Sequence, residues 1–521
     1  MTRNYDIAVF GSGFAGSLIA MIAKRQGHSV VMLERGKHPR MTIGESSTPL
    51  ANLLLEELAT RYDLPAIRPL AKWGSWQRAY PHIGCGLKRG FTFYQHEAGK
   101  PDAADLDHAR QLLVAASPHD EIADTHWYRP EFDLFLVNQA QALGVDYIDE
   151  ASTERLLELE DGLSFDVVRK EETKEFRARF AIDATGPRGL MHRAFHLPES
   201  TLLNYPLTQA LYSHFSGVSL PKAQRDSDQE VPPYPPEQAA VHHVFDGGWV
   251  WVLRFNNGIT SAGVAATEEA ARRLNLGEGE TAWKRLLDSI PTLKGQFGKA
   301  RAELPFTYLP RLSFLNSRVT GHRWAMLPSA VGFIDPLLST GFPLTLLGVS
   351  RLAAILGGGL SAANLQSDLE SYASKTSEEL LATSQMIAGL YANMGNFRVF
   401  RSLSLLYFAA ASYSESARRL GKSHLATSFL LHDHPAFGPI CKQLLERAMH
   451  IASDREASSL IQDIRQAIEP IDVAGFSDAT KKGWYPVNAE DLQQSADKVE
   501  STRGEIESML LACGFYHAAV E

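Results

Sequence analysis

The segment at residues 5–36, YDIAVFGSGFAGSLIAMIAKRQGHSVVMLERG, constrains the fold more than any other part of the chain. A short apolar run at 7–10 leads into three glycines, Gly11, Gly13 and Gly16, in G-x-G-x-x-G spacing. A helical pattern of apolar residues follows, and then a second apolar run that ends at Glu34. This order predicts a strand, a tight turn, a helix and a parallel strand, which is the start of a Rossmann-like α/β domain.

The same segment predicts a dinucleotide site. Gly11 would allow the tight turn, Gly13 would let the backbone approach a pyrophosphate, and Gly16 would let the helix pack on the strand. The helix N-terminus would face the phosphates, and an acidic residue about 20 residues further on would accept a ribose hydroxyl. The cofactor-binding residues expected here are Gly11, Gly13, Ala15, Gly16, Glu34 and Arg35.

Two later segments favour FAD over NAD. RFAIDATGPRG, at 179–189, reads as a strand that runs into Gly186. Residues 324–356 read as a strand, a loop with Asp335 and Gly341, and a long helix. Three separated segments around one extended cofactor suit FAD. Because the glycine motif occurs once, no nicotinamide site is evident, and a separate flavin reductase would have to supply reduced FAD.

The motifs GSGFAG, DATG and DPLLSTG resemble those of the glutathione-reductase-like flavoproteins of the aromatic hydroxylase and flavin-dependent halogenase group. The resemblance covers roughly residues 5–360. It implies an α/β fold with an α+β substrate domain: a Rossmann-like FAD-binding domain, an inserted β-sheet domain and a C-terminal helical region. We expect FAD-binding segments at 1–200 and 311–360, a β-rich substrate domain at 201–310 and the helical region at 361–521.

The stretch WVWVLR at 249–254 resembles the halogenase signature W-x-W-x-I-P, without its isoleucine and proline. Residues two apart in a strand share a face, so Trp249 and Trp251 would form one flat wall. In the family this wall separates flavin from substrate, and Phe93 would belong to it here. The alternative is a pair of core tryptophans that pack the sheet on a helix.

The segment CGLKRGFTF at 85–93 resembles the family segment whose lysine meets hypohalous acid and delivers electrophilic halogen. That resemblance makes Lys88 the candidate catalytic residue. A lysine suits the task because its amine is nucleophilic once desolvated and its ammonium donates hydrogen bonds. A solvated surface lysine is the alternative, and Lys72 is a competing candidate.

Ser339, Thr340 and Gly341 resemble the family motif whose backbone amides bind halide beside the flavin. The alternative is a loop that only contacts the isoalloxazine. Tryptophan halogenases carry a glutamate just before this motif, where this chain has Leu338. The departure puts tryptophan in doubt as the substrate and suits a phenol or pyrrole, which its own hydroxyl or nitrogen activates.

Two further segments are expected at the cofactor. Residues 43–58 resemble a family loop over the flavin, which makes Ser47 and Thr48 candidates, and they also read as a capped helix start with Pro49 at its first position. Arg129 leads a helix that resembles the family helix whose arginine reaches FAD.

Composition excludes other classes. A net charge of −9 without a basic block argues against nucleic acid, and no uninterrupted apolar stretch is long enough to predict a membrane span. Three separated cysteines suggest reduced thiols and a cytoplasmic protein. His432 and His434 lack a third ligand in spacing, so no metal site is predicted. The proline-rich stretch at 221–238 reads as a mobile loop rather than packed core.

These observations favour an FAD-dependent halogenase that acts on an electron-rich aromatic of the phenol, pyrrole or indole type, free or tethered to a carrier or peptide. One alternative is a flavin-dependent monooxygenase that hydroxylates an aromatic small molecule or protein side chain. Another is a non-catalytic FAD-binding maturation factor.

Overall fold

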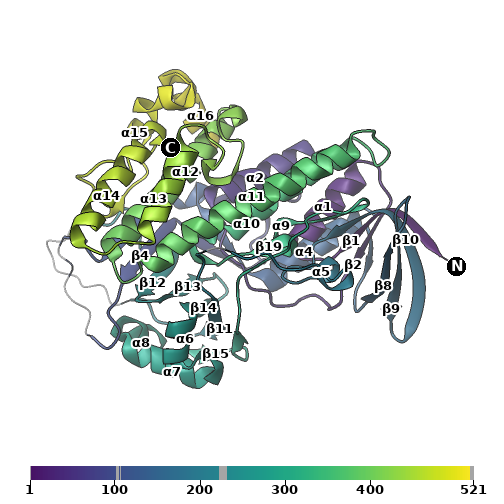
Figure 1. Cartoon of the computed structure of the whole chain (residues 1–521), viewed down its shortest axis with the longest axis horizontal. Coiled ribbons are helices and arrows are strands. Elements are labelled where there is room, and N and C mark those ends of the chain that lie inside the picture. The colour runs from purple at the N-terminus through teal and green to yellow at the C-terminus, as the bar shows by residue number, and fades with distance from the viewer. Residues whose placement is uncertain (1, 101–104, 106, 203, 222–230, 517–521) are drawn as a thin grey trace.

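A computed structural model describes residues 2–100, 105, 107–202, 204–221 and 231–516. The chain forms two sheets joined by long helices, with a bundle of helices at its C-terminal end (Figure 1). The α/β architecture is as predicted, with a Rossmann-like sheet, a second β-rich unit and a helical C-terminal region.

The first sheet is the Rossmann-like one. β1 lies between β2 and β10 and is parallel to both, and β10 also pairs in parallel with β18. A β-hairpin-like extension, β8 and β9, joins antiparallel to β10. The inner half of β1 is wholly apolar and buried, as expected for a central parallel strand. The strands are β1 (Arg3–Phe10), β2 (Val30–Leu33), β7 (Asp146–Ile148), β8 (Ser152–Glu158), β9 (Leu163–Arg169), β10 (Glu172–Asp183) and β18 (Trp324–Met326).

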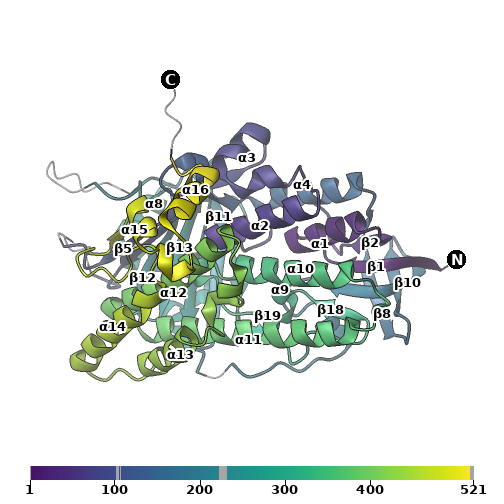
Figure 2. The ribbon, with the colours of Figure 1, turned by 90° about the horizontal axis from the view of Figure 1, so that it is seen from above.

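Long helices pack beside this sheet. α1 (Phe14–Arg25) contacts α4 (Arg129–Ala142) and α10 (Gly341–Gly357), and α10 in turn contacts α2 (Pro49–Arg61) and α11 (Leu365–Ala392). Figure 2 shows α1, α2, α10 and α11 side by side. Within the described residues, the stretch Leu337–Gly357 that contains α10 is the one helix long and apolar enough to cross a membrane. Its apolar side chains are mostly buried against these neighbours, which accounts for its composition.

The second sheet runs in the order β15-β11-β14-β13-β12-β4-β5-β20, with β16 also on β11. It draws on three parts of the chain, because β4 and β5 precede residue 200 and β20 comes from the C-terminal region. The β-rich domain expected at 201–310 therefore does not contain all the strands of this sheet. The strands are β4 (Gly90–Gln95), β5 (Gln111–Ala115), β11 (Thr208–Ser216), β12 (Ala240–Phe245), β13 (Gly248–Arg254), β14 (Ile259–Thr267), β15 (Arg301–Ala302), β16 (Thr307–Leu309) and β20 (Trp484–Tyr485).

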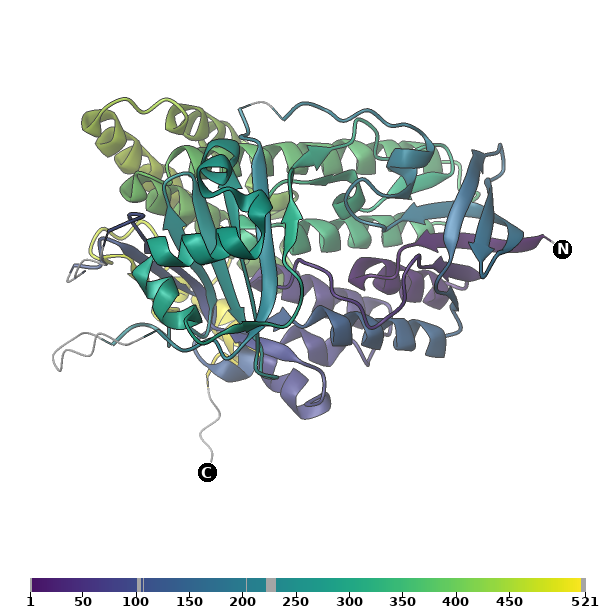
Figure 3. The same cartoon turned by 90° about the horizontal axis from the view of Figure 1, so that it is seen from below.

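The two faces of β13 serve different purposes. Val250 and Val252 pack into a core with α6 (Glu268–Leu274), α7 (Glu280–Ser289) and α8 (Pro291–Phe297), which cover the outer face of the sheet (Figure 3). Trp249 and Trp251 point to the opposite face and join the main core. A strand covered on both faces has no polar alternation, which explains why this segment is apolar throughout.

The C-terminal helices cover the other end of the second sheet. α12 lies on β4, where Phe91 and Phe408 have ring centroids 5.1 Å apart. These helices are α12 (Phe397–Arg419), α13 (Phe437–Ala448), α14 (Asp454–Ile468), α15 (Ala489–Gln494) and α16 (Arg503–Cys513).

The proline-rich stretch at 221–238 differs in part from the expectation of a solvated loop. Residues 222–230 lie outside the described residues. Tyr234, however, is 3% exposed and donates a hydrogen bond of 2.6 Å to the carbonyl oxygen of Phe91. This end of the stretch is packed because a buried phenol finds a backbone acceptor on β4.

Candidate functional site

A cleft of about 940 Å³ lies between the two sheets, where the first βα turn meets the inner face of the second sheet. Segments far apart in the sequence line it: the glycine motif, the loop before Ser47, the turn after β10, the inner face of β13 and the loop before α10. Most of the residues expected at the cofactor lie on its wall: Gly11, Gly13, Ala15, Glu34, Arg35, Arg129, Gly186, Asp335 and Gly341.

The three glycines of the motif have different steric roles. Gly11 has a φ of +95°, and a Cβ there would lie 2.5 Å from the Ala184 carbonyl oxygen. A Cβ on Gly16 would lie 2.0 Å from the Gly11 carbonyl oxygen, so Gly16 serves packing behind the cleft. A Cβ on Gly13 would meet its nearest protein atom, on Arg129, only at 3.7 Å. The protein leaves room at Gly13, as a backbone approach to a bound pyrophosphate requires.

Glu34 lies at the end of β2, as predicted for a ribose acceptor. Its carboxylate accepts hydrogen bonds from the Ser12 amide at 3.1 Å and the Gly36 amide at 2.9 Å, and it pairs with Arg40 at 3.1 Å. Burial opposes the ionised form, but the Gly36 amide and the Arg40 charge outweigh it and lower the pKa of Glu34. An ionised acceptor is therefore held at the mouth of the cleft.

Arg129, the first residue of α4, is buried against the cleft floor. Its guanidinium donates to both oxygens of Asp133, at 2.9 and 2.8 Å, and to the Gly44 carbonyl oxygen at 2.7 Å. The bidentate pair with Asp133 fixes the side chain. The hydrogen bond to Gly44 ties the loop at 41–46 to α4. Arg129 thus shapes the cofactor wall and also lines it.

The loop before α10 is bent by two residues in the left-handed region. Leu338 has a φ of 63° and Ser339 a φ of 55°. The bend places Ser339, Thr340 and Gly341 on the cleft, where α10 begins with amides that have no helical partner. Asp335 caps the same loop by accepting from the Leu337 amide at 3.0 Å, and burial raises its pKa to about 7.

Tyr407 supports this strained bend from α12. Its hydroxyl donates to the Leu338 carbonyl oxygen at 2.9 Å. The resemblance of the Ser339–Gly341 motif implies that this loop binds halide. On that expectation, Tyr407→Phe should loosen the bend by about 1 kcal/mol, the usual worth of one such hydrogen bond, and so weaken halide binding about fivefold. The measurement is KM for bromide at saturating arene. An unchanged KM would show that the bend holds without Tyr407, and Tyr413→Phe, on the same helix, is the control.

Trp249 and Trp251 line the cleft and also belong to the main core, and their indoles are not coplanar. The indoles of Trp249 and Trp251 lie 5.7 Å apart and are tilted by 51°. Different partners orient them, since Trp249 donates to Tyr391 at 3.1 Å and Trp251 to Ser261 at 3.3 Å. Phe93 lies behind His242, stacked on it at 4.4 Å, and is not among the residues that line the cleft.

Ser47 and Thr48 lie outside the cleft lining, contrary to expectation. An isolated bridge between Ser46 and His126 turns the chain away from the cleft. The Ser47 hydroxyl donates to the Thr125 carbonyl oxygen at 2.7 Å, and Thr48 caps α2 by accepting from the Ala51 amide at 3.2 Å. The structure confirms the helix cap, while residues 43–46, at the start of the same segment, do line the cleft.

Lys88 is fully buried at the end of β3 (Cys85–Lys88), which pairs antiparallel with β6 (Asp124–Trp127). Its ammonium donates to the Ser46 hydroxyl at 2.9 Å and to the Ser47 carbonyl oxygen. It also lies 3.8 Å from the ring centroid of Phe91. Burial lowers the pKa of Lys88, and the charge of Asp124 opposes that shift. The alternative of a solvated surface lysine is therefore wrong.

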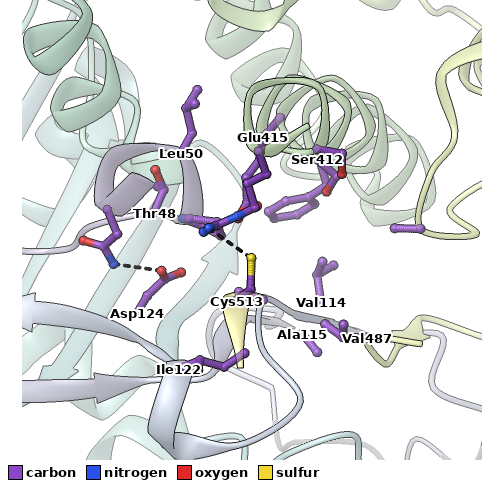
Figure 4. Close-up of a pocket in the computed structure, with 18 of the residues that line it drawn as sticks. Thr48, Leu50, Val114, Ala115, Ile122, Asp124, Ser412, Glu415, Val487 and Cys513 are labelled. Atoms are coloured by element: carbon purple, nitrogen blue, oxygen red, sulfur yellow. Dashed lines mark hydrogen bonds and ion pairs between the residues drawn. The ribbon is translucent and has the colours of Figure 1, made fainter. Parts of the chain in front are cut away.

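A second, smaller pocket lies near the buried Lys88, which is not among the lining residues of either cavity. Figure 4 shows residues that line this pocket. Its volume is about 160 Å³, and its lining is mainly apolar, with α2, β5, α12 and the C-terminal segments all contributing. Phe91 and Asp124 line this pocket, whereas Ser46 lines the cleft. Lys88 contacts residues of both and so lies in the partition between them.

Lys72, the competing lysine, also lines the second pocket. Its ammonium donates to the Cys513 carbonyl oxygen at 3.1 Å, on the C-terminal side. In the described structure Lys72 does not bond Ser46, the residue that links Lys88 to the cleft.

Sequence reasoning missed Asp124, Asn52 and Tyr407. They are single polar residues within a strand or helix and belong to no motif, so their spacing carries no signal. Tertiary packing brings them to one pocket: α12 packs on α2, and Asn52 of α2 donates a hydrogen bond to Asp124 of β6.

Fold and cleft together define a flavoprotein with an extended FAD site. The model of the tryptophan halogenase family matches residues 124–395. This match spans more than half of the chain, and the protein belongs to that family.

Curated relatives agree. The chain is 26% identical over 493 residues to the monodechloroaminopyrrolnitrin halogenase PrnC of Pseudomonas fluorescens, covering 91% of this chain and 83% of the relative. It is 26% identical over 421 residues to the tetracycline 7-halogenase of Kitasatospora aureofaciens, covering 78% and 74%. Among solved structures, halogenase PltM in complex with phloroglucinol and FAD has a TM-score of 0.79 at 21% identity, covering 92% of this chain and 99% of PltM. The protein is an FAD-dependent aromatic halogenase that uses halide.

Proposed function

We propose that the protein halogenates a single-ring, electron-rich arene held in the second pocket, with Lys88 passing the electrophile from the FAD cleft to it. The observation that carries this proposal is the position of Lys88 in the partition. Its ammonium donates to Ser46 on the cleft side and lies against Phe91 on the pocket side.

The pocket sets the substrate size. Its volume is about 160 Å³, and an apolar cavity of about 150 Å³ holds one benzene ring. Phloroglucinol, the ring named in the PltM complex, is of this size class. We therefore infer a phenol or a pyrrole rather than an indole, which agrees with Leu338 in place of the glutamate of tryptophan halogenases.

The chemistry that FAD supplies when bound is the oxidation of halide by oxygen to hypohalous acid. Thr340 and Gly341 would hold the halide with the amides that open α10. Lys88 would then donate its proton to the oxygen of the hypohalous acid. As the halogen–oxygen bond breaks, that oxygen leaves as water and the halogen bonds to the ring.

Two accompanying features belong to the same proposal. A separate reductase would supply reduced FAD, because the described structure contains no second glycine-motif turn for a nicotinamide. A cytoplasmic location would give the protein access to that reductase.

The test is a turnover assay with an unrelated flavin reductase, oxygen and bromide, against single-ring phenols and pyrroles, indoles, and carrier-bound pyrroles. We expect products with the bromine isotope pattern from the single-ring compounds, and none when bromide is omitted. Products that gain only oxygen would instead indicate a monooxygenase. Turnover of indoles or carrier-bound rings alone would overturn the inferred substrate size.

A further inference from the structure

The second pocket contains a buried carboxylate with one unused oxygen. Asp124 is 6% exposed and lies on β6, directly opposite Lys88 in the strand register. Its Oδ1 accepts a hydrogen bond of 2.8 Å from the Asn52 side chain on α2. Its Oδ2 is buried and has no hydrogen-bond partner among the described residues.

An unpaired buried carboxylate oxygen is costly, so its retention needs a reason. Directly opposed residues of an antiparallel pair project to the same side, so Asp124 faces the same region as Lys88. No ion pair within 4.0 Å joins the two among the described residues, because Lys88 donates to Ser46 and Ser47 instead. Asp124 lines the pocket, and Figure 4 shows it projecting there, opposite Glu415 and Ser412 of α12.

Two other carboxylates, Glu56 and Glu415, line this pocket, and each pairs with an arginine. The Glu56 carboxylate lies 3.9 Å from the Arg68 guanidinium. Glu415 accepts a hydrogen bond of 2.8 Å from the Arg419 guanidinium, one turn further along α12. Among the described carboxylates that line the pocket, Asp124 is therefore the one with no arginine ion pair and with a buried, unpartnered oxygen. The charged groups that act on it are Lys88 from β3 and Glu415 and Arg419 from α12.

We propose that Asp124 is a catalytic base that accepts the proton of the O–H or N–H group of the arene during halogenation. This inference rests on the proposed function and narrows its substrate to arenes that carry such an acidic proton. Burial raises the pKa of Asp124, although the charge of Lys88 opposes this shift. The raised pKa brings the carboxylate closer in basicity to a phenolate.

The proposed step balances as follows. Asp124 takes the O–H proton while a ring carbon uses its π electrons to bond the halogen of hypohalous acid. The halogen–oxygen bond breaks, and its oxygen takes the Lys88 proton and leaves as water. The C–H electron pair then restores the aromatic ring, the ring proton passes to the Lys88 amine, and Asp124 returns its proton to the substrate oxygen.

The test compares wild type with Asp124→Asn, which keeps the shape and the Asn52 contact but accepts no proton. With a phenol that is neutral at the assay pH, we expect kcat to fall by about 100-fold. With a phenol of similar size that is already ionised at that pH, we expect the ratio of wild type to variant to approach one. A ratio that stays high with the ionised phenol would overturn the proposal, because a structural defect affects both substrates alike.

Glu415→Gln is the matched control, since it removes another carboxylate that lines the pocket, and it should not show this dependence on substrate ionisation. Melting temperature and FAD affinity report whether each variant is folded. A thioether scavenger in solution, oxidised by hypohalous acid, reports the first half-reaction separately. If wild type oxidises the scavenger and Asp124→Asn has the same kcat as wild type, the role of Asp124 is wrong but the proposed function stands. Wild type that yields neither oxidised scavenger nor aryl halide would overturn the proposed function, and with it this inference.

Discussion

Replacement of Lys88 by methionine is expected to lower aryl halide formation by at least about 100-fold, the lower end of what a positioned proton-transfer group contributes. The reason is its position: Lys88 is buried in the partition between cleft and pocket and contacts residues that line each. Methionine keeps most of the side-chain volume, so the partition should stay packed. The measurement is product per enzyme by mass spectrometry under single-turnover conditions.

Three controls make this result specific. FAD affinity, measured by flavin fluorescence, should be unchanged because Lys88 is not among the residues that line the cleft. Oxidation of a thioether scavenger should persist because the proposed site of halide oxidation is the cleft. Lys72→Met, at a lysine that lines the second pocket, should reduce product formation much less, and equal losses in both variants would reject the assignment of Lys88.

The second large effect is expected at the glycine motif. Gly16→Ala would place a methyl group 2.0 Å from the Gly11 carbonyl oxygen, which is backbone and cannot move aside at low cost. We expect a loss of folding free energy of about 3 kcal/mol or more, the upper range for overpacking, together with loss of bound FAD. Thermal or chemical unfolding of the purified variant measures this loss.

Gly13→Ala is the matched comparison. Its methyl group would meet no protein atom closer than 3.7 Å, so the protein without FAD should melt within a few degrees of wild type. The methyl group would occupy the space left for the pyrophosphate, and we expect the Kd for FAD to rise about tenfold, equivalent to roughly 1.4 kcal/mol. If both variants lost the same folding free energy and bound FAD with the same Kd, the assignment of Gly16 to packing and of Gly13 to pyrophosphate approach would be wrong.

The sequence by itself determined the cofactor half of the protein. The first strand, the glycine turn and Glu34 are close in the chain, and their geometry follows from local backbone rules. G-x-G-x-x-G spacing and an acid at the end of the next strand are therefore sufficient to locate the cleft. Motifs with specific backbone requirements also indicated Gly186, Asp335 and Gly341, which all line it.

The tertiary structure decided the rest, because the second pocket is made by packing rather than by any motif. Ser47 and Thr48 face away from the cleft because a strand bridge at Ser46 and the cap of α2 direct them there. The tilt between Trp249 and Trp251 depends on Tyr391 and Ser261, which lie outside that segment. Asp124 meets Lys88 only through the β3–β6 register, and periodicity within one strand carries no information about which residue a partner strand places opposite.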